Sequence, residues 1–330
     1  MEPFLSVSGI SKRFAPQLTL SDRIAAALGS ATESRTVRAV DGIDLVLKKG
    51  EAVGLVGESG CGKSTLGRII AGIMPPTEGQ VRLDGQPVMS AGGRPQKTTT
   101  RVQMVFQDPF ASLDPRMRVG DALAEGPIAH DLVTKAEASE YVRSWLTTVG
   151  LDPDYATRYP HQFSGGQRQR IAIARALAMK PEVLVCDEPV ASLDVSIQAQ
   201  IINLFLKLRR ELDLTLLFIS HDLGVVRHLC DRVAIMYLGR IVEQGPTRQI
   251  YDDPRHPYTR ALLESVPKLV IDDHVDVQFN PIEGELPSPM SPPPGCHFHA
   301  RCPLSVDRCR SERPHLVPLA ADRAAACHLA

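Results

Sequence analysis

Short apolar runs alternate with longer amphipathic stretches from about residue 183 onward. The runs VLVCDE and LTLLFISH have the length and the branched apolar content of buried strands, and the segment 196–211 between them predicts a helix. A second helical segment and the strand-like run VAIMYLGRIVEQG follow. Regular alternation of strands and helices predicts an α/β fold with a mostly parallel sheet and helices on both faces.

The first half of the chain carries two further patterns. Residues 4–10 and 40–56 alternate in polarity as the strands of a small β region do, and the insertion at 15–37 between them contains a short predicted helix, Ile24 to Leu28. Residues 119–180 place apolar positions at helical spacing, so we expect a mainly helical subdomain there.

The pattern changes after residue 253. A helix-like segment, HPYTRALLESV, is followed by a proline-rich tract over 281–294 and then by a cluster of cysteines. Such a tract buries too little apolar surface to form a core of its own. We therefore predict one main domain over 1–253, with its helical part at about 108–180, and a short C-terminal extension over 254–330.

Composition narrows the class of protein. Apolar residues make up 43% of the 330 positions and charged residues 23%, which is ordinary for a globular protein with a sizeable core. The net charge of −1 supplies no basic field for nucleic acid. We find no basic segment typical of a secretion signal at the N-terminus, and no apolar run approaches the ~18 residues of a membrane span. We therefore expect a cytosolic protein that docks on a membrane protein but is not embedded.

Residues 57–65, GESGCGKST, form the most informative motif, because their spacing is that of a phosphate-binding loop. A strand-like run precedes the motif and a helix-like run follows it, as such a loop requires. The glycines let backbone N–H groups point at phosphate oxygens, and the helix N-terminus adds a favourable dipole. Lys63 supplies a cation for the β- and γ-phosphates, and Ser64 supplies a hydroxyl for Mg²⁺. The alternative is a glycine-rich turn that matches by chance.

Two carboxylates end the run VLVCDE. Asp187 is expected to hold Mg²⁺ directly or through water, and Glu188 to orient and polarise an attacking water. In a parallel sheet this strand end would face the phosphate loop. Alone, the pair could equally mark a plain strand-to-turn boundary, but its distance after the phosphate loop favours the catalytic interpretation.

The segment FSGGQ opens a predicted helix that ends before Pro181. Ser164 is a natural N-cap, and the two glycines after it permit a close approach of backbone. The simpler interpretation is a capped helix, and the functional one is a second phosphate-binding helix terminus. Since one nucleotide already has its phosphate loop, a second such terminus suggests a site shared between two subunits.

Together with Gln107, Ser192-Leu193-Asp194 and His221, these motifs resemble the nucleotide-binding subunit of an ABC transporter over about residues 4–250. Phe163 is a departure, because the signature of that family commonly has Leu there. The resemblance implies a P-loop NTPase of the ABC type. Its expected parts are a RecA-like parallel sheet core, a small antiparallel β region and a helical signature subdomain.

The same resemblance implies roles for individual residues. It places ATP on the phosphate loop, at Gly57, Glu58, Ser59, Gly60, Cys61, Gly62, Lys63, Ser64 and Thr65. It assigns Mg²⁺ to Ser64, Gln107 and Asp187, and catalysis to Glu188, His221 and Gln107. The partner's ATP would face Ser164, Gly165, Gly166 and Gln167, with Asp194 at the dimer interface. Phe14 fits the aromatic residue that stacks on adenine, although an ordinary buried Phe at a strand end is the alternative.

The tail segments HPYTRALLESVP and IEGELPSPMSPPPGCHFHARCP resemble the ATP-binding subunits of oligopeptide and dipeptide ABC transporters. That resemblance implies ATP hydrolysis that powers peptide import at the cytoplasmic face of the bacterial cell membrane. The implied partners are a second, usually different, ATPase subunit, two transmembrane permease subunits and an extracytoplasmic substrate-binding protein. Relatives with such a tail also import nickel complexes, glycans or opines, which remain the alternative substrates.

Cysteines gather in the last 35 residues, at Cys296, Cys302, Cys309 and Cys327. In a reducing compartment such a cluster favours metal over disulfides, and thiolates hold either Zn²⁺ or an iron–sulfur cluster. The intervals do not fit the close pairs of structural zinc. Further candidate ligands are His297, His299 and His328, and chance clustering of unpaired thiols is the alternative.

The family resemblance implies that these cysteines carry a four-iron–four-sulfur (4Fe–4S) cluster, with Zn²⁺ as the alternative. The cysteines lie far along the chain from the ATP motifs, and the catalytic set is complete without them. We therefore expect a structural role, so that loss of the metal would disorder the extension before it affected the ATP site.

Two other classes of protein share some of these features. A soluble ABC-type ATPase that acts on DNA or ribosomes would carry a long coiled-coil insertion or two fused ATPase units, and the sequence has neither. A regulatory metal-binding protein that uses ATP as a switch would be favoured if Glu188 were replaced by a residue without a carboxylate. The sequence therefore favours the importer subunit.

Overall fold

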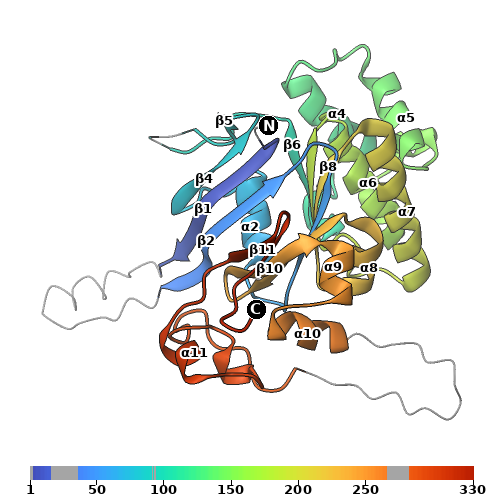
Figure 1. The fold of residues 1–330 in the computed structure, drawn as a ribbon. Helices are drawn as coiled ribbons and strands as arrows, with labels where there is room; N and C mark the ends of the chain where they lie inside the picture. The colour runs from blue at the N-terminus through green and yellow to red at the C-terminus, as the bar shows by residue number, and fades with distance from the viewer. Residues whose placement is uncertain (1–2, 16–35, 91, 93, 266–281) are drawn as a thin grey trace, which may run out of the picture.

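A computed structural model describes residues 3–15, 36–90, 92, 94–265 and 282–330. Figure 1 shows two sheets that share the centre of the molecule, with most of the helices on one side. The short helix predicted at Ile24 to Leu28 lies outside the described residues. Within the described ranges, no helix combines the length and the apolar character needed to cross a membrane.

The larger sheet has eight strands in the order β11-β12-β10-β9-β3-β8-β7-β6. Its parallel part confirms the sheet predicted from the alternating pattern, and it consists of β3 (Ala52–Val56), β6 (Val102–Val105), β7 (Val183–Asp187), β8 (Thr215–Ser220) and β9 (Arg232–Tyr237). The antiparallel edge consists of β10 (Arg240–Pro246), β11 (Val317–Ala320) and β12 (Arg323–Ala325). The carboxyl ends of the parallel strands meet at one edge of the sheet, where ligands bind in such folds.

The smaller sheet is antiparallel and has the order β2-β1-β4-β5. Its strands are β1 (Leu5–Phe14), β2 (Val37–Leu47), β4 (Glu78–Leu83) and β5 (Gln86–Pro87). The grouping of residues 52–56 with this sheet was wrong, because they form the central β3 of the larger sheet. All five residues of β3 are buried, so this strand lacks the alternation of a strand with one wet face.

Ten helices are described. They are α2 (Lys63–Ile70), α3 (Pro109–Ser112), α4 (Val119–Ala129), α5 (Ala138–Thr148), α6 (Gly165–Leu177), α7 (Val195–Leu212), α8 (Leu223–Leu229), α9 (Thr247–Asp252), α10 (Pro257–Glu264) and α11 (Asp307–Ser311). Of these, α2, α6, α8 and α9 pack directly on the parallel strands. Three short 3₁₀ helices are η1 (Pro153–Thr157), η2 (Pro160–Gln162) and η3 (His299–Arg301). The predicted mainly helical stretch at 119–180 is confirmed by α4, α5, η1, η2 and α6.

Side chains of the parallel strands alternate between two apolar cores. Leu55 of β3 and Ile219 of β8 pack with α2 and the smaller sheet, whereas Val56 and Phe218 pack with the helices of the other face. Each strand therefore buries both of its faces, which explains its nearly continuous apolar sequence. The two cores hold the carboxyl edge of the sheet rigid from both sides.

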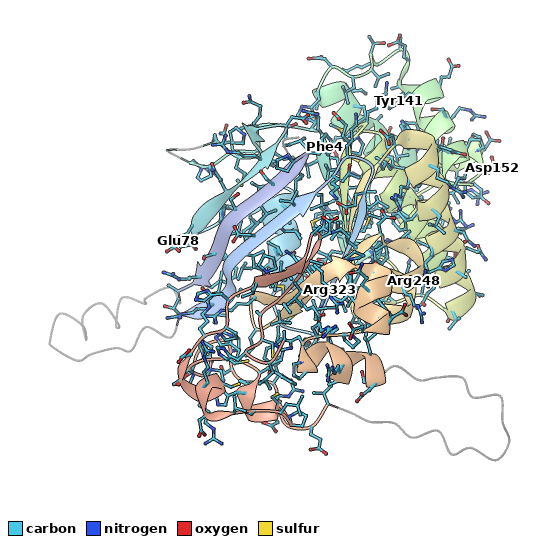
Figure 2. The ribbon with its side chains drawn as sticks, in the orientation of Figure 1. Phe4, Glu78, Tyr141, Asp152, Arg248 and Arg323 are labelled. Carbon is cyan, nitrogen blue, oxygen red and sulfur yellow. The ribbon has the colours of Figure 1, made fainter. Side chains whose placement is uncertain are left out.

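The C-terminal extension is integrated into the larger sheet. Strand β12 pairs with β10, and Phe298 joins the core on the side of the helices. Arg323 of β12, labelled in Figure 2, pairs with Glu243 of β10 at 3.2 Å, and Glu243 is fully buried. Removing one partner of such a buried pair would leave a charge without compensation, so the pair anchors the extension to the sheet.

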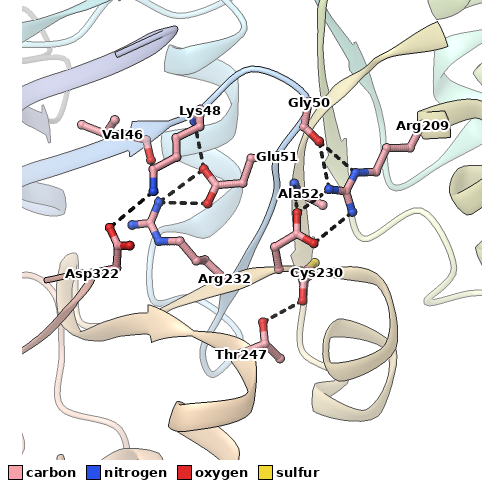
Figure 3. A network of polar contacts seen from close by, with 11 residues as sticks. Val46, Lys48, Gly50, Glu51, Ala52, Arg209, Cys230, Arg232, Thr247 and Asp322 are labelled. Atoms are coloured by element: carbon pink, nitrogen blue, oxygen red, sulfur yellow. Dashed lines mark hydrogen bonds and ion pairs between the residues drawn. The ribbon is translucent and has the colours of Figure 1, made fainter. Parts of the chain in front are cut away.

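A polar network fixes the entry into β3 (Figure 3). Glu51 is 8% exposed and pairs with Arg232 at the start of β9, at 3.2 Å. Arg209 of α7 donates to the carbonyl of Gly50 at 2.9 and 3.0 Å and also pairs with Asp231. Because the strand start is held from two sides, the loop at its other end begins at a fixed position.

Candidate functional site

The phosphate loop runs from the end of β3 to the first residue of α2, as predicted. A Cβ atom at Gly57 would lie 2.1 Å from the carbonyl oxygen of Met236 in β9. Gly62 has a φ of 108°, and a Cβ there would lie 2.0 Å from the carbonyl oxygen of Ala39 in β2. The loop is therefore wedged between the backbones of two strands, and only glycine fits at these two positions.

Lys63 is held inside this loop by the loop itself. Its Nζ donates to the carbonyl oxygens of Gly57 at 2.7 Å and of Glu58 at 3.0 Å, and its side chain is 4% exposed. Nζ also lies 3.9 Å from a carboxylate oxygen of Glu188. A desolvated ammonium group in a ring of backbone atoms can bind the phosphates of a nucleotide strongly.

Ser64 and Asp187 meet across the sheet edge, with the hydroxyl donating to the carboxylate at 2.8 Å. Burial raises the pKa of Asp187, and the hydrogen bond from Ser64 opposes that shift. A hydroxyl and a carboxylate are the hard oxygen ligands that Mg²⁺ prefers. The residues present therefore fit a magnesium ion bound with a nucleotide.

Glu188 is the residue at which the predicted catalytic set converges. Its carboxylate accepts a hydrogen bond from Gln107 Nε2 at 3.1 Å and lies 3.2 Å from His221 Nδ1. Its backbone has a φ of 45°, which is uncommon for a residue other than glycine and turns the side chain out of the strand direction. Gln107 follows β6, Glu188 follows β7 and His221 follows β8, so the parallel sheet brings all three together.

The signature residues form the predicted capped helix start. Ser164 accepts a hydrogen bond from the backbone N–H of Gln167 at 3.3 Å, and the side chain of Gln167 accepts one from Ser164 N–H at 3.0 Å. The capping box closes the N-terminal end of α6. This end faces solvent, since both Ser164 and Gly165 are exposed. Ser164 and Gly165 are therefore open to contact with another molecule.

Two further predicted residues lie on the surface. Asp194 is exposed and precedes α7 without a capping hydrogen bond from its side chain. Phe14 is 39% exposed, which contradicts the alternative of an ordinary buried Phe, and Lys12 Nζ lies 5.4 Å from its ring centroid.

Phe163, the departure from the family signature, is buried. It is 4% exposed and packs edge-on against Tyr155, with the ring centroids 5.3 Å apart, so it fills the core in place of Leu.

Sequence reasoning missed a contact between the extension and the phosphate loop. Arg301 pairs with the Glu58 carboxylate at 2.9 Å, and the hydroxyl of Tyr258 accepts a hydrogen bond from Glu58 N–H at the same distance. The extension therefore contacts the ATP site although the two are distant along the chain, and the expected order of loss, extension before ATP site, stays a prediction. Distance along the chain does not limit contacts in space, and no local pattern links residues 58 and 301.

The structure brings the four predicted cysteine ligands near one another. Their thiols are free, and burial, followed by the nearby thiols of Cys309, Cys327 and Cys302, raises the pKa of Cys296 to about 11. Burial also raises the pKa of Cys302 and of Cys327. In the described part of the chain, no group of three or more His, Cys, Asp or Glu side chains is arranged so that it could hold a metal ion. The structure therefore shows a thiol-rich region in the tail, without a formed metal site among the described residues.

Comparisons with protein families match two segments of the chain. Residues 40–191 match the family described as ABC transporter. Residues 242–309 match the family described as oligopeptide/dipeptide transporter, C-terminal region. The first segment contains the phosphate loop and Glu188, and the second contains most of the predicted tail.

Comparisons with individual proteins agree with these matches. The oligopeptide transport ATP-binding protein AppF of Bacillus subtilis is 51% identical over 295 residues, which cover 89% of this chain and 90% of AppF. The di/tripeptide transport ATP-binding protein DppF of Pseudomonas aeruginosa is 50% identical over 295 residues, or 88% and 90% of the two chains. Among solved structures, cbiO1 of Clostridium perfringens, part of the ABC transporter complex cbiONQ, has a TM-score of 0.60 at 27% identity and covers 77% of this chain and 92% of its own.

The geometry of Lys63 yields a direct test. Lys63→Ala should raise the Kd for ATP roughly 30-fold, or about 2 kcal/mol, because a charge-assisted hydrogen bond to the phosphates is lost. Isothermal calorimetry measures this change. Lys207→Ala is the matched control, because Lys207 makes an exposed pair with Glu211 on α7. An unchanged affinity in the Lys63 variant would show that the loop does not bind phosphates.

Proposed function

The chain belongs to the ATP-binding subunits of oligopeptide/dipeptide ABC transporters, and we propose that its ATP hydrolysis powers import of oligopeptides or dipeptides. The observation that carries the proposal is the meeting of Lys63, Gln107 and His221 at the carboxylate of Glu188. The second candidate substrates are nickel complexes, glycans or opines moved by the same machinery.

Each part of the site has a task in ATP hydrolysis. The loop N–H groups and Lys63 bind the phosphates, while Ser64, Asp187 and Gln107 would hold Mg²⁺. Magnesium, when bound, neutralises charge on the β- and γ-phosphate oxygens. Glu188 polarises the attacking water as a general base, and its position is set by hydrogen bonds on both sides.

Glu188→Gln tests this assignment. The variant should bind ATP with the parent's affinity within about threefold, because the phosphate loop is unchanged. It should hydrolyse ATP on the order of 10²–10⁴-fold more slowly, because the general base is lost. Steady-state phosphate release by the assembled transporter is the measurement. Glu182→Gln, at the opposite end of β7 in a pair with Arg101, is the control. Hydrolysis within twofold of the parent would refute the role of Glu188.

The exposed start of α6 supports a shared ATP site. Ser164 and Gln167 cap the start of the helix with each other, and Ser164 and Gly165 are open to solvent. A helix N-terminus is suited to the γ-phosphate of a nucleotide bound by another subunit. The chain would thus sandwich ATP with a second ATPase subunit, with Asp194 at the interface and Phe14 on the adenine.

A groove beside the helical subdomain is suited to a membrane subunit. It has a volume of about 720 Å³ and lies between β6, α4 and α6. Its wall includes Phe106, next to Gln107, and Ser112 at the end of α3. A cytoplasmic helix of a permease subunit in this groove would sense the ATP site through Gln107. The protein would then sit peripherally at the cytoplasmic face of the membrane, in a complex supplied by an extracytoplasmic binding protein.

Blocking this groove should abolish transport and leave ATP binding intact. Ala129 lines the groove at the end of α4 and is exposed, so Ala129→Arg should prevent co-purification with the permease subunits. ATP affinity should stay at the parent's value, because no residue of the phosphate loop lines this groove. Ala320→Arg on the exposed strand β11 is the control. Normal uptake and co-purification in the Ala129 variant would refute the docking site.

We also infer that the thiols of the extension, over about 254–330, hold a 4Fe–4S cluster, with one Zn²⁺ as the alternative. The support is the proximity of four free thiols, and burial, together with the neighbouring thiols, raises the pKa of Cys296, Cys302 and Cys327. Such thiols can ionise together only if a positive centre compensates their charge. Cys296, Cys302, Cys309 and Cys327 would be the ligands.

Metal content decides between these possibilities. Anaerobically purified protein should be brown and should contain about four iron atoms per chain, as expected of one such cluster. Cys309→Ser should lose the iron, whereas Cys230→Ser, at a buried cysteine outside the extension, should keep it. About one zinc without iron would refute the cluster. Neither metal, with four freely titrating thiols, would refute a metal site altogether.

A further inference from the structure

Glu58 introduces a negative charge into a loop that binds polyanions. It follows Gly57 directly, and its carbonyl oxygen accepts a hydrogen bond from Lys63 Nζ. ATP with its phosphates carries about four negative charges, and charges within a Debye length of about 8 Å interact appreciably. An uncompensated carboxylate at this position would therefore oppose the binding that the loop provides.

Arg301 of the C-terminal extension compensates this charge. Its Nη1 donates to both carboxylate oxygens of Glu58, at 2.9 and 3.2 Å, and lies 3.4 Å from the hydroxyl of Tyr237. Its Nε donates to the carbonyl oxygen of Glu283 at 3.1 Å. The side chain of Arg301 is only 6% exposed, so the pair with Glu58 is screened little by water.

A second contact fixes the backbone of the same residue. The hydroxyl of Tyr258 in α10 accepts a hydrogen bond from Glu58 N–H at 2.9 Å. Tyr258 is fully buried, and its ring packs against Tyr237 at 4.6 Å and against Phe298 at 5.3 Å. Phe298 precedes η3, the short helix that ends at Arg301. The aromatic cluster therefore sets the position of the Arg301 side chain relative to the loop.

We propose that Arg301 is a positioning residue for the phosphate loop, through which the docked C-terminal extension sets the affinity for ATP. This inference rests on the ATP site proposed above and adds a residue from outside that site. Arg301 neutralises Glu58 and holds its side chain away from the phosphates. Loss of the pair would leave a partly buried carboxylate without a partner beside the phosphates.

A double-mutant cycle tests the proposal on the full chain. Arg301→Gln should raise the Kd for ATP roughly tenfold, which corresponds to about 1.4 kcal/mol, because Glu58 then repels the phosphates. KM for ATP should rise by a similar factor, whereas kcat at saturating ATP should fall less than about twofold. In a Glu58→Gln background, the same Arg301→Gln change should alter Kd by less than about twofold, because the repelling charge is absent.

Two further variants separate charge compensation from a loss of structure. Arg301→Lys keeps the charge and should recover at least about half of the lost binding free energy. Arg308→Gln breaks an exposed pair with Glu312 in the same extension and should leave the Kd at the parent's value.

An unchanged Kd in Arg301→Gln would overturn the proposal. So would an equally weakened Kd in both backgrounds, since that result would mean that the extension had come away from the core. If the parent protein itself failed to bind ATP, the proposed function would be wrong, independently of Arg301.

Discussion

The contacts of one carboxylate hold the site together. Glu188 reaches Lys63 at 3.9 Å, Gln107 at 3.1 Å and His221 at 3.2 Å, so it joins the ends of three parallel strands to the phosphate loop. Its left-handed backbone directs the side chain across the sheet edge, at a conformational cost of order 1 kcal/mol. Packing on both faces of the sheet offsets this conformational cost, because β7 and its neighbours cannot shift without opening a cavity in one of the two cores.

The phosphate loop is confined from several directions at once. Gly57 lies against β9 and Gly62 against β2, so both sheets contribute a wall. The extension supplies a further wall through Tyr258 and Arg301. A loop that is already held in place loses little conformational entropy when phosphates bind, and such preorganisation is a general source of affinity.

Much of the site could be predicted from the sequence, because its motifs are local and their spacing reflects chemistry. Lys63, Asp187 and Glu188 each occupy the end of a recognisable strand or loop, and a parallel sheet brings such ends together. The assignment of residues 52–56 failed because a central strand has no polar face. The contact between Glu58 and Arg301 could not be predicted, since two ordinary charged residues far apart in the chain carry no local signal.

The coupling between the extension and the loop must act in both directions. If docking of the extension strengthens ATP binding by some factor, then bound ATP stabilises the docked extension by the same factor, as linkage requires. Arg301 lies in a turn that begins at Cys296 and ends at Cys302, since His299 N–H and Cys302 N–H both donate within it. Under the proposed role of Arg301, a chemical change at these thiols that moved the turn would also change the charge that the phosphates meet at Glu58. The tail is thus best understood as part of the wall of the nucleotide site and not as a separate appendage.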